Sequence, residues 1–471
     1  MREESREGFE SMEFAAVVKR YKKMLSEDRT EFFDVSDFEY IADHYIDKNQ
    51  LTNALHACNI ALGQHPNSSI VKIKKAQVLL GQMKVNKALH LLNHISKIES
   101  ANPDVLMMLG VCHNMLGDNV KAAQFLRKAE RLSFEDRDEL LYNIAGSFIQ
   151  NEDFEEAIPY LDKAYKENPK NDSVLYDLAF CYDKTGKDKL CIEFYNKYLD
   201  IDPFSESAWY NLGIVYNRLE QFEEAIDAYD FALAIDSKYA GAIFNKANSL
   251  SALERFEEAT SCYHEYLKFD PKSVDAHLYL AECYFQLDDP DTAYIYYDKS
   301  IQLDPKNADA WYGAAIVLMI EERLEESIAL LKKALKLDPL CSDCWNALGK
   351  AHAALHNFFE AENAFQKAID LDEYNPDFRI SLAEYYFQTN QTDMAIITLS
   401  EASESRAACP AINFRLAGYL ISNKREDLAV PIFEQGISEE YGLYHDFFEF
   451  FPDFRSIKWI NDLIKEYSPE E

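Results

Sequence analysis

The sequence predicts an all-α solenoid of about twelve helix pairs. A pattern of large and small residues recurs every 34 residues along most of the 471-residue chain. Two positions of that pattern hold small residues in every copy, and proline recurs after the second helix of a pair. A fixed period of this length is the signature of stacked repeats that share one continuous core.

The pattern is clearest near the middle of the chain, where it reads large, Leu-Gly, Tyr, Ala, aromatic, Ala: Trp209, Leu212, Gly213, Tyr216, Ala225, Tyr229 and Ala232. Ten of the eleven steps between repeat starts are 34 residues long and one is 35, so the register is kept throughout. The predicted repeats 1 to 12 start at Val35, Ser69, Pro103, Asp138, Asp172, Glu206, Ala240, Val274, Ala308, Ser342, Pro376 and Pro410.

Positions within a repeat are counted from its first residue. Position 8 is Ala or Gly in all twelve repeats, and position 20 is Ala in all but two, which have Cys191 and Ser327. A large side chain at either position would push the two helices of a pair apart where they cross. Proline stops the second helix in six repeats: Pro66, Pro169, Pro203, Pro271, Pro305 and Pro339.

Over residues 35–443 this pattern resembles the tetratricopeptide-repeat family. The resemblance implies a right-handed superhelix with a concave groove lined by the first helix of each repeat. Repeats 2, 3, 11 and 12 match least; Lys75 replaces the Leu at position 7 of repeat 2, and repeat 12 lacks the aromatic residue at position 4. The chain also resembles bacterial cytosolic proteins made only of such repeats, which favours a cytoplasmic scaffold.

Both ends need covers, because a terminal repeat exposes one apolar face. Residues 1–34 are predicted to form an N-terminal capping helix from the apolar residues Phe9, Met12, Val17, Val18, Tyr21, Met24 and Leu25. Residues 444–471 are predicted to hold a C-terminal capping helix and an acidic end, from Phe454, Ile457, Ile460, Leu463, Ile464 and Tyr467. The aromatic segment 447–451 is either a packed bridge into this cap or a docking or dimerisation surface.

In the family, positions 2, 5, 6, 9, 12 and 13 face the groove. Repeats 4 to 7 place Tyr-Asn, Tyr-Asp, Tyr-Asn and Phe-Asn at positions 5 and 6. Asn amides match the repeating N–H and C=O groups of an extended peptide, and aromatic rings add contact area. The predicted peptide contacts are Tyr142, Asn143, Tyr176, Asp177, Tyr210, Asn211, Asn217, Phe244, Asn245, Asn248, Tyr279 and Tyr312. The same column is also the family's commonest choice, which leaves a purely structural role as the alternative.

Charge restricts the partner. The chain has 82 acidic and 48 basic residues, a formal net charge of −34, which disfavours nucleic acids and anionic membranes. The groove positions hold thirteen acidic residues against five basic ones, and no three repeats have the Lys-Asn-Arg clamp with which relatives bind acidic C-termini. We therefore expect a neutral or basic protein or peptide as partner. No apolar stretch is long enough to span a membrane.

The sequence predicts neither an enzyme nor a cofactor or metal site. It has no phosphate-binding loop, no metalloprotease helix motif and no nucleophile elbow. The histidine pairs His90 and His94, and His352 and His356, are spaced for joint ligation, but we interpret them as structural. The nine scattered cysteines predict reduced thiols in the cytoplasm, with Cys341 and Cys344 as small junction residues.

The sequence thus predicts a non-catalytic scaffold that binds a polypeptide segment in its groove. The alternative is a structural subunit that self-associates through its terminal caps, so homo-oligomerisation stays open. An enzyme with a site hidden in the groove is a third class, for which the sequence offers no convergent nucleophile and base.

Overall fold

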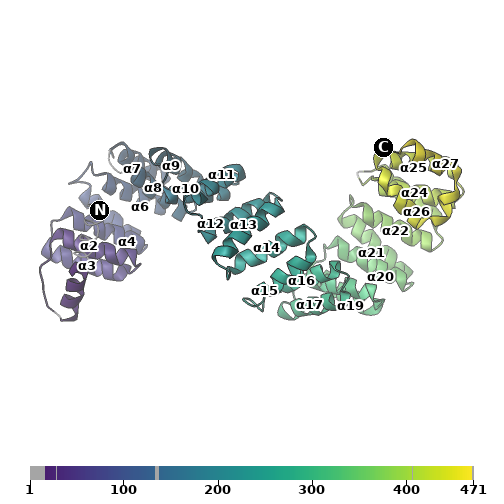
Figure 1. Cartoon of the computed structure of the whole chain (residues 1–471), viewed down its shortest axis with the longest axis horizontal. Coiled ribbons are helices and arrows are strands. Elements are labelled where there is room, and N and C mark those ends of the chain that lie inside the picture. Colours follow the sequence, from purple (N-terminus) through teal and green to yellow (C-terminus); the bar gives the residue numbers. More distant parts are fainter. Residues whose placement is uncertain (1–15, 28, 133–136, 406, 469–471) are drawn as a thin grey trace. The chain divides into compact units, whose positions relative to one another are not determined.

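The computed structural model describes residues 16–27, 29–132, 137–405 and 407–468, and this part of the chain is all helical (Figure 1). The chain divides into two compact units, Met1–Ser237 and Lys238–Glu471. Within each unit, consecutive helices pair antiparallel and each pair packs on the next. The predicted all-α solenoid of helix pairs is confirmed.

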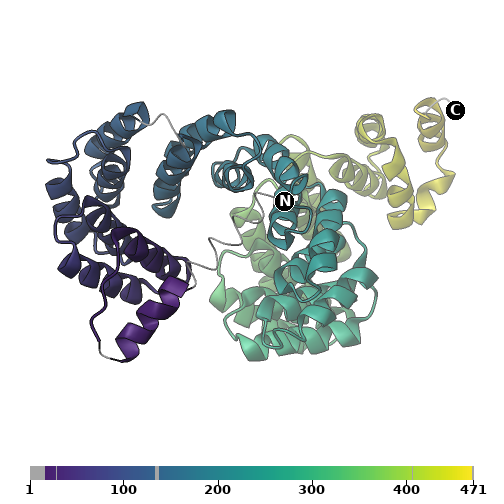
Figure 2. The same ribbon diagram turned by 60° about the vertical axis from the view of Figure 1, so that its left-hand side comes forward.

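Unit 1 (Met1–Ser237) begins with a helix over residues 16–26. Six helix pairs follow, stacked one on the next (Figure 2). Their bounds are α2 Val35–Asp47, α3 Leu51–Gln64, α4 Ser69–Gly81, α5 Val85–Ile95, α6 Pro103–Met115, α7 Asn119–Leu132, α8 Arg137–Gln150, α9 Phe154–Glu167, α10 Asp172–Lys184, α11 Asp188–Leu199, α12 Glu206–Arg218 and α13 Phe222–Ile235.

Unit 2 (Lys238–Glu471) has six further pairs and a C-terminal end piece. The pairs are α14 Ala240–Ala252, α15 Phe256–Tyr266, α16 Val274–Gln286, α17 Pro290–Leu303, α18 Ala308–Ile320, α19 Leu324–Leu337, α20 Ser342–Ala354, α21 Phe358–Leu371, α22 Pro376–Gln388, α23 Thr392–Ser403, α24 Pro410–Ser422 and α25 Glu426–Glu439. The end piece is η1 Tyr441–Leu443, α26 Tyr444–Phe450, η2 Pro452–Ser456 and α27 Lys458–Glu466.

The first helix of each pair starts where the 34-residue frame puts a repeat start, except that α8 begins one residue earlier, at Arg137. Side chains just before these starts explain the boundary. The hydroxyl of Ser68 accepts from the Val71 N–H, and Asn171 Oδ1 accepts from the Val174 N–H, so that donors of the first turn are satisfied. The division into twelve repeats and two caps stays a prediction.

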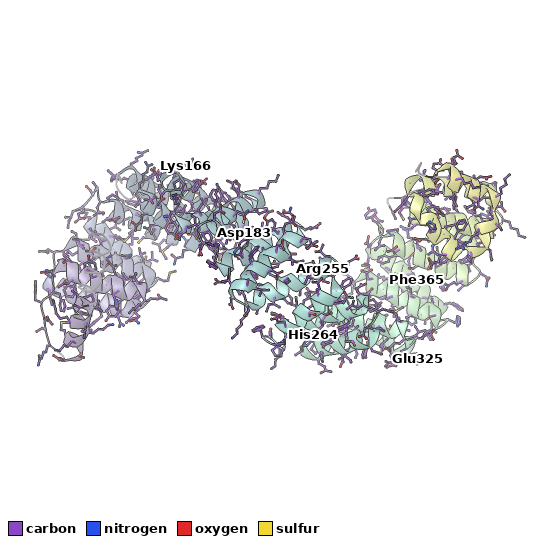
Figure 3. All side chains as sticks on the ribbon, viewed as in Figure 1. Lys166, Asp183, Arg255, His264, Glu325 and Phe365 are labelled. Carbon is purple, nitrogen blue, oxygen red and sulfur yellow. A yellow bond between two sulfur atoms is a disulfide. The ribbon has the colours of Figure 1, made fainter. Side chains whose placement is uncertain are left out.

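The small residues at positions 8 and 20 lie where the helices of a pair cross. All position-20 residues are at most 1% exposed. The buried hydroxyl of Ser327 donates a hydrogen bond to the Ala315 carbonyl at 2.8 Å. The Phe365 ring (labelled in Figure 3) packs against Gly349 so closely that a Cβ there would collide with it. Close helix contact therefore explains why both positions exclude large side chains.

A left-handed residue ends the first helix of every pair. Position 15 has a φ between 54° and 76° in each of the twelve pairs, and only two of these residues are glycine. The other ten are Asn49, Met83, Glu152, Glu220, Glu254, Asp288, Glu322, His356, Asn390 and Lys424. A side chain in this conformation is strained, so the tight turn between the two helices stores some unfavourable energy.

The terminal segments pack against their neighbouring repeats. Val17, Val18, Tyr21 and Met24 are buried as predicted, whereas Leu25 is exposed. Phe9 and Met12 lie outside the described residues. At the other end Ile460 is buried, with Phe454, Ile457, Leu463, Ile464 and Tyr467 partly buried around it.

The aromatic segment 447–451 favours the packed bridge of the two predicted interpretations. Phe447, Phe448 and Phe451 are buried in the core of unit 2, and Phe451 fills the space beside Gly418. Phe450 is partly exposed, with the Arg415 guanidinium 3.2 Å from its ring centroid. Buried rings cannot act as a docking surface without leaving the core.

Candidate functional site

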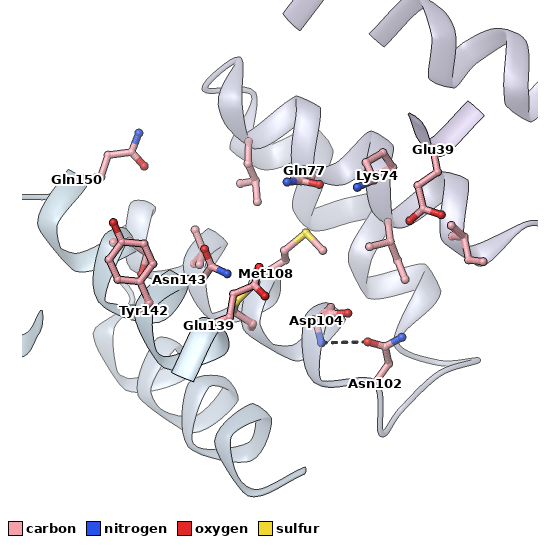
Figure 4. A pocket seen from close by; sticks show the side chains of 17 residues that line it. Glu39, Lys74, Gln77, Asn102, Asp104, Met108, Glu139, Tyr142, Asn143 and Gln150 are labelled. Carbon is pink, nitrogen blue, oxygen red and sulfur yellow. Dashed lines mark hydrogen bonds between the residues drawn. The ribbon is translucent and has the colours of Figure 1, made fainter. Parts of the chain in front are cut away.

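The first helices of unit 1 line an open hollow of about 650 Å³ (Figure 4). All of its lining residues lie on α2, α4, α6 and α8, apart from Asn102, which caps the start of α6. Its apolar lining residues are Ile70, Ile73, Leu80, Met107, Met108 and Val111. The hollow therefore lies on the face that the sequence predicts to be the groove, and it includes Tyr142 and Asn143.

Three amides in this hollow are unused. Gln77, Asn143 and Gln150 are exposed, and none has a hydrogen-bond partner within the described residues. Each amide offers two donors and one acceptor. The hollow can therefore hydrogen-bond a ligand without first breaking a bond within the chain.

The hollow is also acidic. Glu39, Asp104 and Glu139 line it and pair with no basic side chain in the described part of the chain. The ammonium of Lys74 is the one basic group among the lining residues, and it is 2.8 Å from a carboxylate oxygen of Asp43. The pairing cancels the charge of Lys74, so the hollow keeps an excess of negative charge.

Tyr142 and Asp177 interact with each other. The Asp177 carboxylate lies close enough to the Tyr142 hydroxyl to influence its ionisation. Burial and the nearby negative charge of Asp177 raise the pKa of Tyr142 to about 12. Burial raises the pKa of Asp177, and the neighbouring Tyr142 side chain opposes that rise. Tyr142 lies on α8 and Asp177 on α10, so the two side chains influence each other across neighbouring repeats.

Further along unit 1, the predicted contact residues form hydrogen bonds and ring contacts within the chain. Asn211 donates from Nδ2 to the Tyr176 hydroxyl at 3.1 Å, and the Tyr176 ring packs edge-on against Tyr198. The Tyr210 ring is tilted over Tyr229, with centroids 6.0 Å apart. Asn217 is not without a partner. These residues form one wall, and their polar groups already interact with other residues of the chain.

The predicted residues of unit 2 form a similar wall. Asn248 Oδ1 accepts from the Tyr263 hydroxyl at 2.6 Å. The Phe244 ring packs against Tyr279 and Tyr263, with centroids 6.0 and 5.9 Å apart. Asn245 is not without a partner. Of the amides that the sequence singles out, Asn143 is the one that the described structure leaves unbonded.

Tyr312 lines a second hollow, of about 320 Å³, which the sequence analysis did not predict. The other lining residues are Glu282, Phe285, Gln286, Tyr297, Asp309, Gly313 and Ile316, from α16, α17 and α18. Burial and the charge of Asp309 raise the pKa of Glu282, although its side chain remains open to solvent. The signal available in the sequence was Gly313, the only position-6 residue without a side chain.

The structure corrects one expectation about cysteine. Cys341 and Cys344 form a disulfide at the start of α20, so the prediction of nine reduced thiols is wrong for this pair. Their Cα atoms are 5.3 Å apart, as disulfide geometry requires. The other seven cysteines are free thiols.

The histidine pairs give no sign of metal binding. His352 is buried, and its Nδ1 is 3.3 Å from Asn357 Nδ2, whereas His356 lies exposed in the turn after α20. No group of three or more His, Cys, Asp or Glu side chains in the described residues is arranged to hold a metal ion. None of the helices described has the length and apolarity needed to cross a membrane.

Comparison with known proteins gives four family models that match the chain. Two are tetratricopeptide-repeat models, over residues 148–213 and 207–239. A model of the N-terminal tetratricopeptide repeats of Psidin matches residues 43–175, and the C-terminal domain of cilia and flagella-associated protein 70 matches residues 240–442. None of these four models describes an enzyme. No curated protein matches.

Several solved structures are similar over part or most of the chain. The Cut9-Hcn1 hetero-tetramer of the APC/C is 15% identical, with a TM-score of 0.41, and the match covers 92% of this chain and 95% of that one. YrrB, described as a tetratricopeptide-repeat protein with an unusual peptide-binding site, is 23% identical over 40% of this chain and 95% of that one, with a TM-score of 0.35. A tetratricopeptide-repeat protein from Parabacteroides merdae is 19% identical over 53% of this chain and 98% of that one, with a TM-score of 0.37.

The matches of the four family models run on from residue 43 to residue 442. Over the same residues the structure is a stack of helix pairs with small residues at each crossing. The chain is a tetratricopeptide-repeat protein.

Proposed function

We propose that this chain is a non-catalytic scaffold that binds a polypeptide segment in the hollow of unit 1. One observation carries the proposal: Gln77, Asn143 and Gln150 present unused amides around an apolar floor. A polypeptide backbone supplies the complementary carbonyls and N–H groups, and its side chains would contact Met107 and Met108. The open shape of the hollow suits a segment that lies along it.

The partner segment is basic in this proposal. Glu39, Asp104 and Glu139 face the hollow with no basic partner from the described chain, and Lys74 is neutralised by Asp43. Lysine or arginine side chains would pair with these carboxylates, whereas acidic segments would be repelled. The other predicted contacts, Tyr176 to Asn217 in unit 1 and Phe244 to Tyr312 in unit 2, are proposed to contact a polypeptide within their own unit. A cytoplasmic location is part of the proposal.

Selection of peptides tests the proposal. A displayed library of random 12-residue peptides would be panned on the full chain, and the affinity of selected peptides would be measured by fluorescence polarisation. We expect sequences rich in lysine and arginine, and a loss of affinity of roughly tenfold on Asn143→Ala, or on Asp104→Asn combined with Glu139→Gln, as for one lost hydrogen bond to a charged or amide group.

Matched controls lie outside the hollow. Asn93→Ala removes an exposed amide of α5, and Glu155→Gln removes an exposed carboxylate of α9. Both controls should leave the affinity unchanged. Peptides without basic residues, or peptides that bind the hollow variants as tightly as the unaltered chain, would contradict the proposal.

A further inference from the structure

The second hollow and the wall beside it can be compared at three positions, of which two differ. The closed wall is defined by Asn248, Tyr263 and Tyr279, and the open wall by Glu282, Tyr297 and Gly313. Glu282 is one repeat after Asn248 at position 9, Tyr297 is one repeat after Tyr263 at position 24, and Gly313 is one repeat after Tyr279 at position 6. The two walls can therefore be compared residue by residue.

The open wall is hollow because of Gly313. In the closed wall the Tyr279 ring covers Tyr263, with centroids 6.2 Å apart. In the open wall Gly313 has no side chain to cover Tyr297, and the hydroxyl end of Tyr297 lies against it, with the oxygen 2.8 Å from where a Cβ of residue 313 would be. A cavity of about 320 Å³ remains beside this hydroxyl.

The hydroxyl of Tyr297 lacks a partner. The equivalent Tyr263 hydroxyl donates to Asn248 at 2.6 Å. Tyr297 is 5% exposed, yet its hydroxyl has no hydrogen-bond partner among the described residues, although Glu282 occupies the position of Asn248. This oxygen is not among the enclosed polar atoms that lack a partner, so it faces the hollow and can bond a ligand or solvent there.

The chemistry of the lining points to a cation. Glu282 and Asp309 reach the hollow with no basic partner in the described part of unit 2, and none of its lining residues is basic. Phe285, Tyr297 and Tyr312 add aromatic rings, which attract cations at their faces. The pKa of Glu282 is raised, which agrees with a carboxylate that lacks a positive neighbour.

We propose that the open wall binds one arginine side chain of a polypeptide partner. The guanidinium would pair with Glu282 and Asp309, donate to the Tyr297 hydroxyl and lie against the aromatic rings. A planar guanidinium has five donors and can serve two carboxylates and a hydroxyl at once, and it stacks on rings, which an ammonium does less well. This inference rests on the proposed function in taking the partner to be a polypeptide.

Binding of a small probe to the full chain tests the inference. The probe is the N-acetyl, N′-methylamide derivative of arginine, followed by saturation-transfer NMR titration. The same derivatives of citrulline, which is neutral and nearly isosteric, and of lysine are the comparison ligands. We expect binding in the millimolar range for the arginine derivative and at least tenfold weaker binding for the citrulline and lysine derivatives.

The variants are Glu282→Gln and Asp309→Asn, with Asp275→Asn as the matched control. Asp275 is exposed and is one repeat before Asp309 at position 2, but it does not line the hollow. Each hollow variant should weaken the arginine probe about tenfold and the control should not. Tyr297→Phe removes the unpartnered hydroxyl, keeps the ring, and should weaken the probe severalfold.

Three results would overturn the inference: no binding at a probe concentration of about 20 mM, equal binding of the lysine or citrulline derivative, or full binding by both hollow variants. Because the probe is a single amino acid derivative, its failure would leave the peptide hollow of unit 1 untouched. Loss of peptide binding on Asn143→Ala, in turn, says nothing against arginine binding by the open wall. The two proposals can therefore fail separately.

Discussion

The closed and open walls of unit 2 occupy equivalent positions in neighbouring repeats, but their side chains leave one wall packed and the other hollow. In the closed wall, Tyr263 is covered by Tyr279 and hydrogen-bonded by Asn248. In the open wall, Tyr297 lies beside Gly313 and next to Glu282, with its hydroxyl unbonded. The two walls differ by two exchanges, Asn to Glu at position 9 and Tyr to Gly at position 6. With these exchanges the tyrosine of position 24 loses both its covering ring and its hydrogen bond.

The difference teaches that the repeat pattern and the binding surface use the same positions. A tyrosine at position 24 stabilises its repeat when a ring at position 6 covers it and a side chain at position 9 bonds its hydroxyl. Without these two neighbours the tyrosine becomes available to a ligand. The free energy lost in the open wall is small for a long solenoid, because each repeat depends mainly on its neighbours. A repeat array can therefore keep a site that lowers its own local stability.

The largest expected effect comes from opening the closed wall with Tyr279→Gly. Loss of a half-buried ring costs about 2 kcal/mol and glycine within a helix about 1 kcal/mol more, so we expect local stability to fall by about 3 kcal/mol. Hydrogen exchange of peptides from α14 to α16, followed by mass spectrometry, would measure it, since a long repeat array need not unfold in one step.

Tyr279→Phe is the control for this change. It keeps the ring over Tyr263 and removes a hydroxyl that has no hydrogen-bond partner among the described residues. Exchange should stay within about 0.5 kcal/mol of the unaltered chain. If Tyr279→Gly left exchange unchanged, the ring would not be what closes this wall.

A smaller effect separates the two buried tyrosines. Tyr263→Phe should lower local stability by about 1 to 1.5 kcal/mol, because Asn248 loses its partner at 2.6 Å. Tyr297→Phe should change stability by less than about 0.5 kcal/mol, because its hydroxyl has no hydrogen bond within the described residues to lose. Equal losses in the two variants would mean that the walls do not differ in hydrogen bonding.

The fold could be predicted from the sequence because close packing at helix crossings admits only small residues, which recur at fixed positions. Small residues at positions 8 and 20 lie at helix crossings, so Gly213 and Ala225 indicate where the two helices of their pair meet. The open wall could not be predicted, because Glu282 at position 9 could have bonded Tyr297 as Asn248 bonds Tyr263. That outcome depends on side-chain geometry, as does the internal hydrogen bond of Asn211 to Tyr176. The Cys341–Cys344 disulfide likewise depends on a Cα separation that the spacing alone does not fix.

The left-handed residues at position 15 give a modest effect that should be the same in both walls. Glu254 ends α14 with a φ of 59°, and Asp288 ends α16 with a φ of 58°. Glycine adopts this conformation without strain, so Glu254→Gly and Asp288→Gly should each raise local stability by about 0.5 to 1 kcal/mol, after the greater flexibility of unfolded glycine is subtracted. Hydrogen exchange of the flanking helices would show it.

Unequal gains at these two turns would mean that the walls differ in backbone as well as in side chains. Gly186→Ala is the opposite control, because Gly186 has a φ of 68° and an added Cβ would touch nothing. Its expected loss of about 1 kcal/mol reports backbone strain without any packing change.

The smallest effect is a dependence on pH that only the open wall should show. The pKa of Glu282 is raised from its ordinary value to about 7 by burial and by Asp309 of α18; the nearby titratable groups are Tyr263, Tyr279, Tyr297 and Cys283. Because the folded chain binds this proton more tightly than the unfolded chain, the stability gained is complete below the ordinary pKa of glutamate and is lost as the pH rises through about 7. Solvent screens this contribution, because the Glu282 side chain is exposed.

Glu282→Gln should therefore slow hydrogen exchange in α16 at pH 7.5, relative to the unaltered chain, and the difference should shrink toward pH 5. Asn248 of the closed wall cannot titrate, so Asn248→Asp provides the reciprocal test by placing a carboxylate beside the Tyr263 hydroxyl. There the hydroxyl can donate to the new carboxylate, which favours its ionised form and opposes the rise in pKa that burial causes. A pH dependence of the same sign and size in both walls would show that the lone carboxylate, rather than the missing cover of residue 313, sets the behaviour of the open wall. A dependence confined to Glu282 would show that a carboxylate at position 9 acts in this way only where the tyrosine of position 24 does not bond it.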